Sequence, residues 1–244
     1  MDRVDVIVLT KNSERVLKEC FDSIFKNVPV NHLIVVDGHS TDSTLDIVRR
    51  FQEKYGNLIL IQHAGTRGSA RLTGIREVKT EWFLFVDSDV TLSDNWFIEA
   101  KNLVAKDVGA VWGVEVWAGI QNRMLLKLFL KITRRIFEIR GGTHDLLVRY
   151  EAVKDIDIPK DLHVFEDTFI TEWIQKKGYK LIATYEPYCM HYRPTFVWTI
   201  TGSLGIIAET MRYGPLKKVL QLVPAYGFYT VYVLYRSLSQ KLKL

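Results

Sequence analysis

Short apolar runs alternate with amphipathic segments from Val4 to Val90. Within the amphipathic segments, apolar residues recur at three- and four-residue spacing, which predicts helices, the first capped by Ser13 and the second beginning near Thr44. The apolar runs are nearly continuous, which predicts strands buried on both faces of a sheet. Four strands are expected, at Val4–Leu9, Leu33–Val36, Leu58–Ile61 and Phe83–Val86, with a third helix over Ala70–Val78. This alternation predicts an α/β fold with a parallel sheet between helices.

The pattern becomes mixed after Val90. A strand is predicted over Ala110–Val116, an amphipathic helix over 123–140, and a helix, short strands and an apolar tail after Val148. The first strand is followed by Thr10-Lys11-Asn12-Ser13, so the dinucleotide-binding motif Gly-x-Gly-x-x-Gly is absent there. Hydride chemistry therefore has little support.

The positive charge is concentrated in the C-terminal tail. The net charge is +5, and from Phe196 onward six cations face the single acid Glu209, so the preceding residues are formally neutral. The tail contains an uncharged run, Val219–Tyr235, which is shorter than the roughly 20 residues of a spanning helix and is interrupted by Pro224 and Gly227. A Tyr-rich apolar run with basic flanks suits an anionic membrane surface. The alternative is a helical appendage packed on the core or on a second subunit.

A second basic stretch lies between Arg123 and Arg140. Its cations and its apolar residues follow complementary three- and four-residue steps, which predicts a basic amphipathic helix. Such a helix is either a solvated lid or a membrane-surface element. Nucleic acid is not expected as a partner, because the cations are interleaved with long aliphatic side chains: Arg123, Leu125, Lys127, Leu128, Phe129, Lys131, Ile132, Arg134 and Ile136.

Composition indicates an ordinary globular protein. The 244 residues are 48% hydrophobic, enough for one large domain or for a domain with an appendage. The two cysteines, Cys20 and Cys189, suggest neither a disulfide framework nor a cysteine-based zinc site, which fits a reducing compartment. Two acids within Met1–Asp5 and a strand directly behind them argue against a signal peptide. We therefore expect a cytoplasmic protein, held peripherally on the inner face of the cell membrane.

The most informative motif is Asp87-Ser88-Asp89, directly after the fourth predicted strand. Residues two apart on a strand point the same way, so the two carboxylates can share one hard cation. Ligands of open α/β sheets bind at the carboxyl ends of strands, and a metal held there by carboxylates keeps positions for water and substrate phosphates. The alternative is a polar turn, in which Asp and Ser are common.

Two further polar segments are expected at the same edge of the sheet. Asp37 ends the second strand and can accept hydrogen bonds from a nucleoside, whereas helix capping alone would explain Ser40–Ser43. The segment Gly65–Gly74 brings Arg67 and Arg71 to a helix start, which suits a diphosphate. An exposed basic turn is the alternative reading of that segment.

Glu166 and Asp167 open a predicted helix whose apolar face includes Phe169, Ile170 and Ile174. Acids in the first turn of a helix are stabilised by its dipole. From these residues alone, capping of the helix and a functional role for the two acids are equally open.

Taken together and in this order, these segments resemble the inverting glycosyltransferases of family two, which use nucleotide-sugar donors on a GT-A fold. The resemblance covers about Val4 to Tyr213, and it implies a Rossmann-like, mostly parallel sheet with a mixed acceptor half. It implies nucleoside contacts for Thr10, Asn12 and Asp37 and a phosphate contact for Arg71. The expected donor site consists of these four residues with Arg67, Asp87 and Ser88. It also implies that Mn²⁺ or Mg²⁺ binds to Asp87 and Asp89, with Asp89 the usual direct ligand. His191, expected as the third metal-site residue, matches a histidine that closes on the metal or the diphosphate.

The same resemblance makes Asp167 the catalytic base, with Glu166 beside it, and places Gly141–Thr143 and Arg149 near the acceptor. Inverting transfer is an in-line displacement at the anomeric carbon, so it needs a base for the acceptor proton and a cation for the leaving diphosphate. A carboxylate base favours a hydroxyl acceptor, on a glycan or a lipid-linked glycan, over a polyprenyl phosphate, which is already a nucleophile.

The resemblance implies a GT-A domain over 1–195, with a nucleotide-sugar half to about 115 and an acceptor half over 116–195, followed by a basic apolar appendage over 196–244. Two departures qualify it. Gly38-His39 stands where the commonest nucleoside motif has a second acid, so the donor is left open. Glu209–Tyr213 keeps only the spacing of the processive motif Gln-x-x-Arg-Trp, so transfer of a single sugar is expected.

Two other functions remain open from the sequence. A sugar nucleotidyltransferase also combines a nucleotide-binding sheet with metal-binding acids, but it usually needs a Gly-rich basic loop after the first strand, where this chain has Lys11 alone. The other is a catalytically silent protein that binds a nucleotide sugar or a membrane surface.

Overall fold

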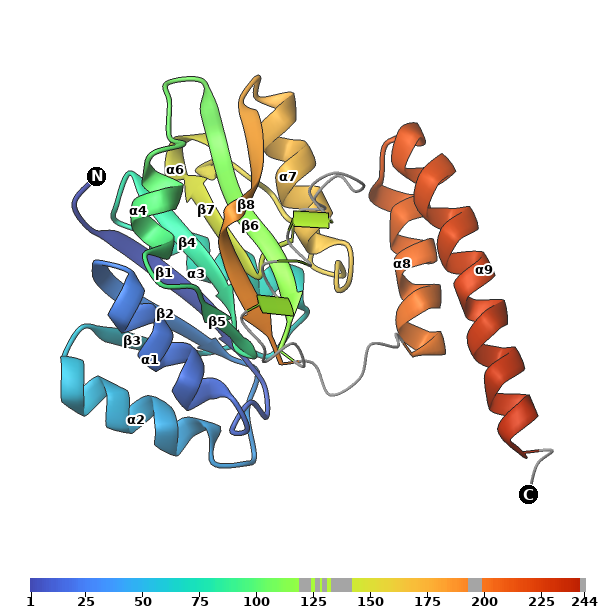
Figure 1. Cartoon of the computed structure of the whole chain (residues 1–244), viewed down its shortest axis with the longest axis horizontal. Helices are drawn as coiled ribbons and strands as arrows, with labels where there is room; N and C mark the ends of the chain where they lie inside the picture. Colours follow the sequence, from blue (N-terminus) through green and yellow to red (C-terminus); the bar gives the residue numbers. More distant parts are fainter. Residues whose placement is uncertain (119–123, 126–127, 129–130, 133–141, 193–198, 242–244) are drawn as a thin grey trace.

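The computed structural model describes residues 1–118, 124–125, 128, 131–132, 142–192 and 199–241. Its strands are β1 (Val4–Thr10), β2 (Val30–Asp37), β3 (Leu58–Gln62), β4 (Trp82–Asp87), β5 (Val90–Leu92), β6 (Val108–Trp117), β7 (Asp145–Arg149) and β8 (Lys180–His191). They form one sheet in the order β3-β2-β1-β4-β7-β6-β8-β5 (Figure 1). Each strand that the sequence predicted by residue range lies within one of these strands.

The first half of the sheet is parallel, which confirms the prediction from alternating elements. β1 lies between β2 and β4, and β2 also pairs with β3, with every pair parallel. In this register Thr10 lies opposite Asp37, and Leu9 lies opposite Asp87. The backbone pairing therefore gathers the polar ends of three strands at one edge of the sheet.

The second half of the sheet is mixed, as predicted. β7 runs antiparallel to both β4 and β6, whereas β8 runs parallel to β6 and antiparallel to β5. The pairing of β5 with β8 puts Val90 opposite His191. His191 is thereby brought beside the turn formed by Asp87–Asp89.

Helices cover both faces of the sheet (Figure 1). Those of the body are α1 (Leu17–Asn27), α2 (Thr44–Tyr55), α3 (Arg67–Arg76), α4 (Trp96–Lys101), α6 (Tyr150–Val153) and α7 (Glu166–Lys176). On one face α1, α2 and α4 bury side chains such as Phe21 and Trp96 against the sheet. On the other face α3, α6 and α7 do the same, with Ile170 and Ile174 fully buried. Burial on both faces explains the near-continuous apolar strands.

Two helices begin elsewhere than the sequence predicted. α1 starts at Leu17 with Val16 as its N-cap, because the Ser13 hydroxyl is hydrogen-bonded to Ser88 Oγ at 2.9 Å and does not cap the helix. α3 starts at Arg67, before the predicted start, because the Thr66 side chain accepts the Ser69 N–H and caps it there. Both differences come from side chains at the edge where the strands end.

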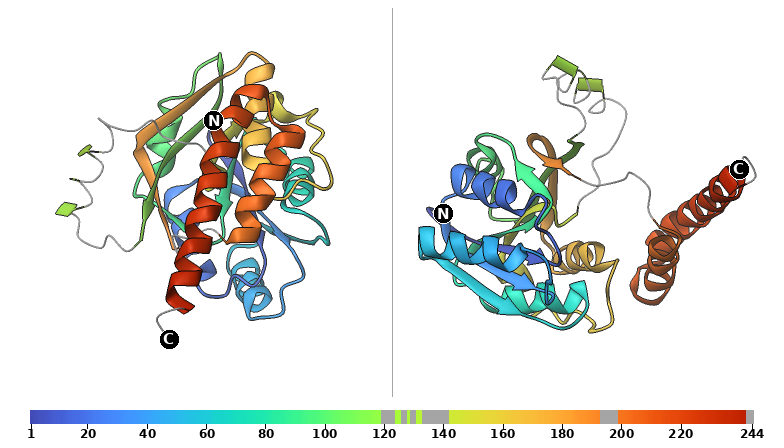
Figure 2. Two further views of the ribbon diagram at one scale, coloured as in Figure 1. Left: turned by 90° about the vertical axis from the view of Figure 1, so that its right-hand side faces the viewer. Right: turned by 90° about the horizontal axis from the view of Figure 1, so that it is seen from below.

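The described C-terminal residues form two antiparallel helices, α8 (Ile200–Tyr213) and α9 (Leu216–Lys241), which pack on each other beside the body (Figure 2). Although the sequence predicted an interruption at Pro224 and Gly227, α9 is continuous. A proline removes one helical hydrogen bond, and a helix of 26 residues retains its other turns. In the part of the chain that the structure describes, no helix is both long and apolar enough to cross a membrane.

The basic amphipathic helix predicted over 123–140 lies mostly outside the described residues, as do Gly141 and Arg193. The apolar side chains described within that stretch are exposed: Met124, Leu125, Leu128 and Ile132.

Candidate functional site

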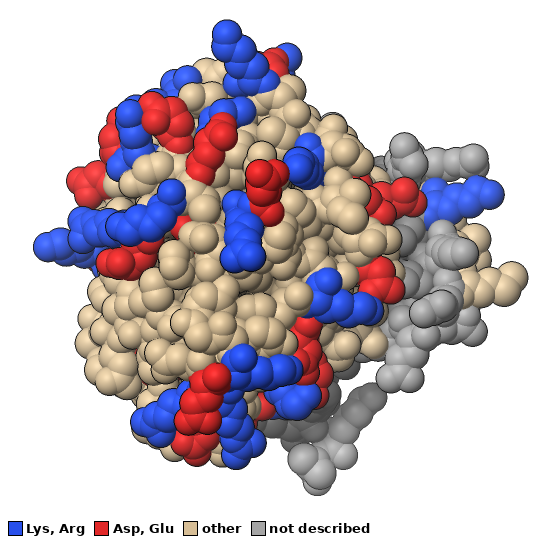
Figure 3. Space-filling model, turned by 90° about the vertical axis from the view of Figure 1, so that its left-hand side faces the viewer, with Lys and Arg blue, Asp and Glu red and all other residues tan. Residues whose placement is uncertain are grey.

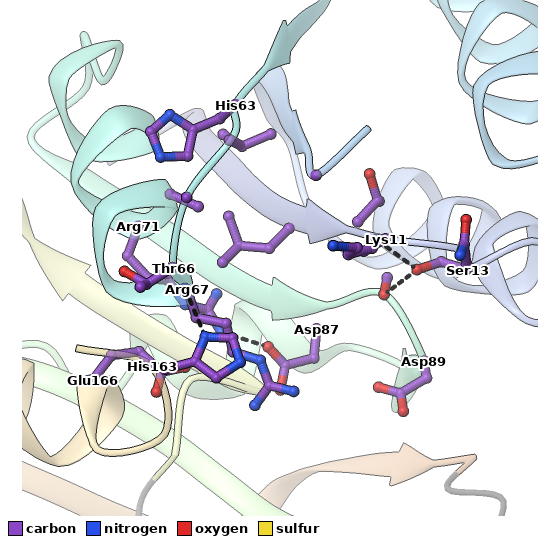
Figure 4. A pocket seen from close by; sticks show the side chains of 18 of the residues that line it. Lys11, Ser13, His63, Thr66, Arg67, Arg71, Asp87, Asp89, His163 and Glu166 are labelled. Carbon is purple, nitrogen blue, oxygen red and sulfur yellow. Dashed lines mark hydrogen bonds and ion pairs between the residues drawn. The ribbon is translucent and has the colours of Figure 1, made fainter. Parts of the chain in front are cut away.

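A cavity of about 760 Å³ opens where β1, β2 and β4 end (Figure 4). This volume is typical of a small-ligand site. Nine of the eleven predicted site residues line it: Thr10, Asn12, Arg67, Arg71, Asp87, Ser88, Asp89, Glu166 and His191. Asp37 and Asp167 are not among the lining residues. The structure thus brings segments that are far apart in the sequence into one site.

Arg71 and Asp87 form an ion pair in the wall of the cavity. Arg71, which is only 3% exposed, donates from Nη2 to Asp87 Oδ1 at 2.7 Å and also donates to Thr143 Oγ1. Its guanidinium lies over the Phe85 ring, 4.9 Å from the ring centre. Burial disfavours the charged form of Asp87, but the charge and hydrogen bond of Arg71 outweigh it and lower the pKa of Asp87 to about 2. Asp87 is therefore ionised at neutral pH.

Asp89 lies in the same cavity but pairs with His191. Asp89 Oδ1 is 3.0 Å from His191 Nε2, and Glu115 Oε1 is 3.0 Å from His191 Nδ1. Burial opposes a charge on His191, yet its hydrogen bonds to these two carboxylates raise its pKa to about 9. In the structure His191 is therefore an imidazolium held between two carboxylates. It can bind a metal through Nε2 only by giving up the hydrogen bond to Asp89.

Asp37 stabilises the loop that follows β2. It is fully buried, and its carboxylate accepts hydrogen bonds from Thr10 Oγ1 at 2.9 Å and from the Ser40 hydroxyl and backbone N–H. Its chain neighbours Val36 and Gly38 line the cavity instead. In this conformation Asp37 shapes the predicted nucleoside pocket from behind, and direct contact with a nucleoside stays a prediction.

Two non-glycine residues near this pocket have left-handed backbone conformations. Asn12 has φ 51° and His39 has φ 58°. The Asn12 side chain is tied into the same loop, because its Oδ1 accepts the Thr41 N–H at 2.9 Å. Such conformations are uncommon and concentrate where ligands bind. Both residues lie in the segments that the sequence assigned to the nucleoside.

Glu166 and Asp167 form the first turn of α7, with Glu166 across the cavity from Asp89 (Figure 4). Glu166 is 5% exposed, and burial together with the charge of Asp167 raises its pKa to about 7. Burial also raises the pKa of Asp167. The N-cap of α7 is Phe165, so neither acid occupies the capping position. Both carboxyl groups are thus better proton acceptors than ordinary surface carboxylates.

Gly142 adjoins this pair of acids. A Cβ on Gly142 would lie 2.7 Å from His144 Nδ1 and 3.6 Å from Asp167 Oδ2. The first distance is too short for a real contact, so a side chain here would displace His144. The described end of the predicted acceptor loop therefore lies beside Asp167, and the missing side chain leaves space for His144.

Several lining residues were not predicted from the sequence. Lys11, His63 and His163 also face the cavity, and the Arg67 N–H donates to His163 Nδ1 at 3.4 Å. Glu115, the second partner of His191, was missed as well. In Val114-Glu115-Val116 the strand alternation predicts that Glu115 points to the opposite face from the two valines. It does not predict the partner, because His191 belongs to a strand far along the chain.

A separate buried cluster contains His144, Asp145 and Cys189, whose ligand atoms lie within 4.8 Å of one another. Among the described residues it is the one group of at least three such side chains at this spacing. Asp145 Oδ2 already accepts hydrogen bonds from Trp96 Nε1 at 2.9 Å and from the Gly113 N–H at 3.1 Å. Burial raises the pKa of Asp145 well above its ordinary value, and its two hydrogen bonds tie β7 to β6 and α4.

Comparison with known proteins gives these features a context. The profile of the family described as glycosyl transferase family 2 matches residues 5–140, more than half of the chain. The poly(ribitol-phosphate) beta-glucosyltransferase of Bacillus spizizenii is 36% identical over 93 residues, which are 36% of this chain and 15% of that protein. The poly(ribitol-phosphate) beta-N-acetylglucosaminyltransferase TarS of Staphylococcus aureus is 29% identical over 187 residues.

The TarS match covers 70% of this chain and 32% of TarS. The chain therefore spans less than a third of the length of each of these two relatives. Among solved structures, a mannosyltransferase from Pyrobaculum calidifontis in complex with GDP-Man and Mn²⁺ is similar with a TM-score of 0.67 and 21% identity, covering 98% of this chain and 80% of that one. Residues 1–349 of TarS with UDP-GlcNAc give a TM-score of 0.62 and 21% identity, covering 92% and 71%. These similarities confirm the GT-A fold.

Proposed function

The chain belongs to glycosyl transferase family 2, and from that premise we propose that it is an inverting glycosyltransferase which moves one sugar from a nucleotide-diphosphate sugar to a hydroxyl acceptor. One observation carries the proposal. A single cavity has Asp87 and Asp89 with Arg71 on one side, and across it Glu166 in the first turn of α7, with Asp167 next in the chain. In-line displacement requires such an arrangement, because the leaving group and the proton acceptor act on opposite sides of the anomeric carbon.

The donor set suits a divalent metal. Two carboxylates and one imidazole lie at the carboxyl end of β4, from Asp87, Asp89 and His191. The Asp89 side chain is 37% exposed. Carboxylate oxygens suit Mn²⁺ and Mg²⁺, and the imidazole favours Mn²⁺ of the two. Because Asp87 is paired with Arg71, Asp89 is the carboxylate better placed to be a ligand. A cation bound there supplies charge that neutralises the leaving nucleoside diphosphate.

The chain's own residues account for the remaining chemistry. Arg71 and Arg67 bring positive charge to the side where the diphosphate leaves. Asp167 accepts the proton of the acceptor hydroxyl as that oxygen forms its bond to the anomeric carbon. The bond between the anomeric carbon and the diphosphate oxygen breaks in the same step, and the nucleoside diphosphate leaves with the electron pair. Gly142 leaves room for the acceptor beside Asp167.

The relatives narrow the proposed substrates. Both curated relatives are named for the transfer of a sugar to poly(ribitol-phosphate), whose repeating unit offers hydroxyl groups. We propose an acceptor of that kind, a glycan or lipid-linked polymer with free hydroxyls. UDP-linked and GDP-linked sugars both occur in similar structures, so both nucleotides belong in a donor panel. A nucleotidyltransferase would instead release pyrophosphate, and a silent binding protein would release nothing.

We also propose that the C-terminal helices, as the appendage 196–244, hold the enzyme on an anionic membrane. Among the described side chains, α9 exposes seven large apolar ones: Leu216, Leu220, Phe228, Val231, Tyr232, Leu234 and Tyr235. No acid follows Glu209 in the sequence, whereas Lys217 lies near the start of α9 and Lys241 at its end. By contrast, basic and acidic side chains are interspersed on the face of the body in Figure 3. An exposed apolar surface with only positive charge is suited to anionic headgroups.

One experiment tests the proposed activity directly. The purified chain is mixed with Mn²⁺ and with UDP-, GDP- and dTDP-sugars, with and without a ribitol-phosphate oligomer as acceptor. We expect nucleoside diphosphate release that rises with acceptor, together with a product carrying one added sugar. Release of pyrophosphate, or of no product with any donor, would contradict the proposal.

A further inference from the structure

Glu209 on α8 holds the backbone that leads into the two acids of α7. Its carboxylate accepts three consecutive backbone N–H groups: His163 at 3.0 Å, Val164 at 2.8 Å and Phe165 at 3.0 Å. The next residue is Glu166. α7 has no side-chain cap of its own, and this carboxylate from another helix binds the N–H of its N-cap residue Phe165 together with the two N–H groups before it.

The three N–H groups belong to the loop of residues 160–165, which precedes α7. This loop is bound to α8 at a second point. Asp161 accepts a hydrogen bond from Tyr213 Oη at 2.6 Å and another from Arg212. Arg212 and Tyr213 belong, with Glu209, to the segment that keeps the spacing of the processive motif. In the structure these three side chains contact residues 161–165.

The opposite side of the loop is held by α3, which carries the predicted diphosphate-binding arginines. The Gly68 N–H donates to the Leu162 carbonyl at 3.0 Å, and the Thr66 hydroxyl donates to the Lys160 carbonyl at 2.8 Å. A Cβ on Gly68 would lie 2.8 Å from the Leu162 carbonyl oxygen, so the loop lies tightly against α3. The loop is therefore fixed between the donor side of the site and the C-terminal helices.

We propose that Glu209 is a positioning residue for the transfer reaction: by binding these three N–H groups it sets where Glu166 and Asp167 lie relative to the acceptor. The inference rests on the proposed function for its kinetic part. This role differs from a simple attachment of the C-terminal helices to the body. An attachment requires only contact, whereas positioning requires that the backbone next to the proposed base is held in one place. Displacement of a reacting group by about 1 Å can cost a hundredfold in rate.

Three variants of the full-length chain test the proposal. Glu209→Ala removes the acceptor, and Glu209→Gln keeps one carbonyl oxygen that can accept up to two of the three N–H groups. Lys218→Ala is the matched control, since it removes the 3.7 Å contact between α9 and Glu172 of α7 without touching residues 163–165. For each variant, kcat, the donor KM, the melting temperature and amide hydrogen exchange at Val164 and Phe165 are measured.

We expect Glu209→Ala to lower kcat at least about tenfold, with the donor KM changed less than about twofold and with faster exchange at both amides. Glu209→Gln should fall between the wild type and the Ala variant in kcat, and Lys218→Ala should match the wild type in kcat and in exchange. Unchanged exchange in Glu209→Ala would overturn the anchoring, and faster exchange with unchanged kcat would overturn the positioning role. A wild type without transfer activity contradicts the proposed function instead, while exchange still decides whether Glu209 holds the loop.

Discussion

Arg71 donates from Nη2 to Asp87 Oδ1 across 2.7 Å, and this contact gives the two acids of the Asp87-Ser88-Asp89 turn different partners. The guanidinium compensates the charge of Asp87 within the protein. Asp89, two residues on, has an imidazole partner and is more exposed to the cavity. Of the two carboxylates, Asp89 is the one that we propose exchanges its partner for a cation.

Asp89→Ala should weaken nucleoside diphosphate binding sharply in Mn²⁺ and change it little in chelator, because diphosphate and cation bind as a unit. Calorimetric titration with and without EDTA measures both affinities. Asp46→Ala on α2 serves as a control, since it removes an exposed carboxylate that pairs with Arg49 away from the cavity. Equal titration curves for the wild type and Asp89→Ala in Mn²⁺ would refute the metal assignment.

Asp167→Asn should lower the transfer rate by about a hundred- to ten-thousand-fold, because an amide of the same size cannot accept the acceptor's proton. Donor binding should survive, and the melting temperature controls for folding. The hydrogen bond that Asp167 Oδ1 accepts from the Thr168 N–H can persist with the Asn oxygen, so a large loss of stability is not expected.

A transfer rate above about a tenth of wild type in Asp167→Asn would mean that the base lies elsewhere. Glu166 is then the next candidate, because it lines the cavity directly and its pKa is raised to about 7. The corresponding Glu166→Gln variant would show the larger loss in that case.

Glu166→Gln should stabilise the fold at pH 8 and leave it nearly unchanged at pH 4. Burial and the neighbouring Asp167 raise the pKa of Glu166 from 4.5 to about 7, so the folded state binds this proton more tightly than the unfolded chain does. The stability from this carboxyl is present below pH 4.5 and is lost as pH rises through 7. A neutral amide avoids that loss, worth about 1 to 3 kcal/mol. Denaturant unfolding at pH 4 and pH 8 measures the free energy of unfolding of both proteins. The same difference between variant and wild type at the two pH values would refute the raised pKa.

A chain that ends at Lys218 should no longer float with anionic vesicles, while donor hydrolysis stays largely intact, because the truncation leaves α8 and the cavity in place. The double variant Leu220→Ser with Phe228→Ser should weaken flotation as well, since both side chains are exposed on α9. Ile98→Ser on α4 is the matched control for an exposed apolar residue in the body. Flotation that is insensitive to truncation and to salt would favour a packed appendage.

The sequence predicted the parallel half of the sheet from local pattern, and pattern and resemblance together predicted nine of the 21 residues that line the cavity. Three of the four apolar runs place Thr10, Asp37 and Asp87 at strand ends, and parallel pairing then brings those ends together. His191 was placed by family resemblance, and the β5–β8 pairing explains its position. The same reasoning does not distinguish Asp37, which is buried behind the pocket, from Asp89, which faces it, because both are acids after apolar runs.

Features that depend on side-chain partners far along the chain were not predictable. Ser13 looks like a helix cap, yet its hydroxyl bonds Ser88 on another strand end. Glu115 and His163 carry no local signal for the residues that they contact. Glu209 was interpreted only as a changed residue in a motif, since its partners are backbone N–H groups that no sequence pattern identifies.

The bonds from Glu209 to residues 163–165 also bear on how this protein can be shortened. A chain cut near residue 195, where the resemblance implies that the catalytic domain ends, would leave those three N–H groups without their acceptor. Such a fragment could bind a nucleotide and still transfer no sugar. Its inactivity would then result from the lost contact of Glu209 with the backbone and not from a lost acceptor site. On this proposal the smallest fragment that can transfer a sugar extends at least through Tyr213, which binds Asp161 of the same loop.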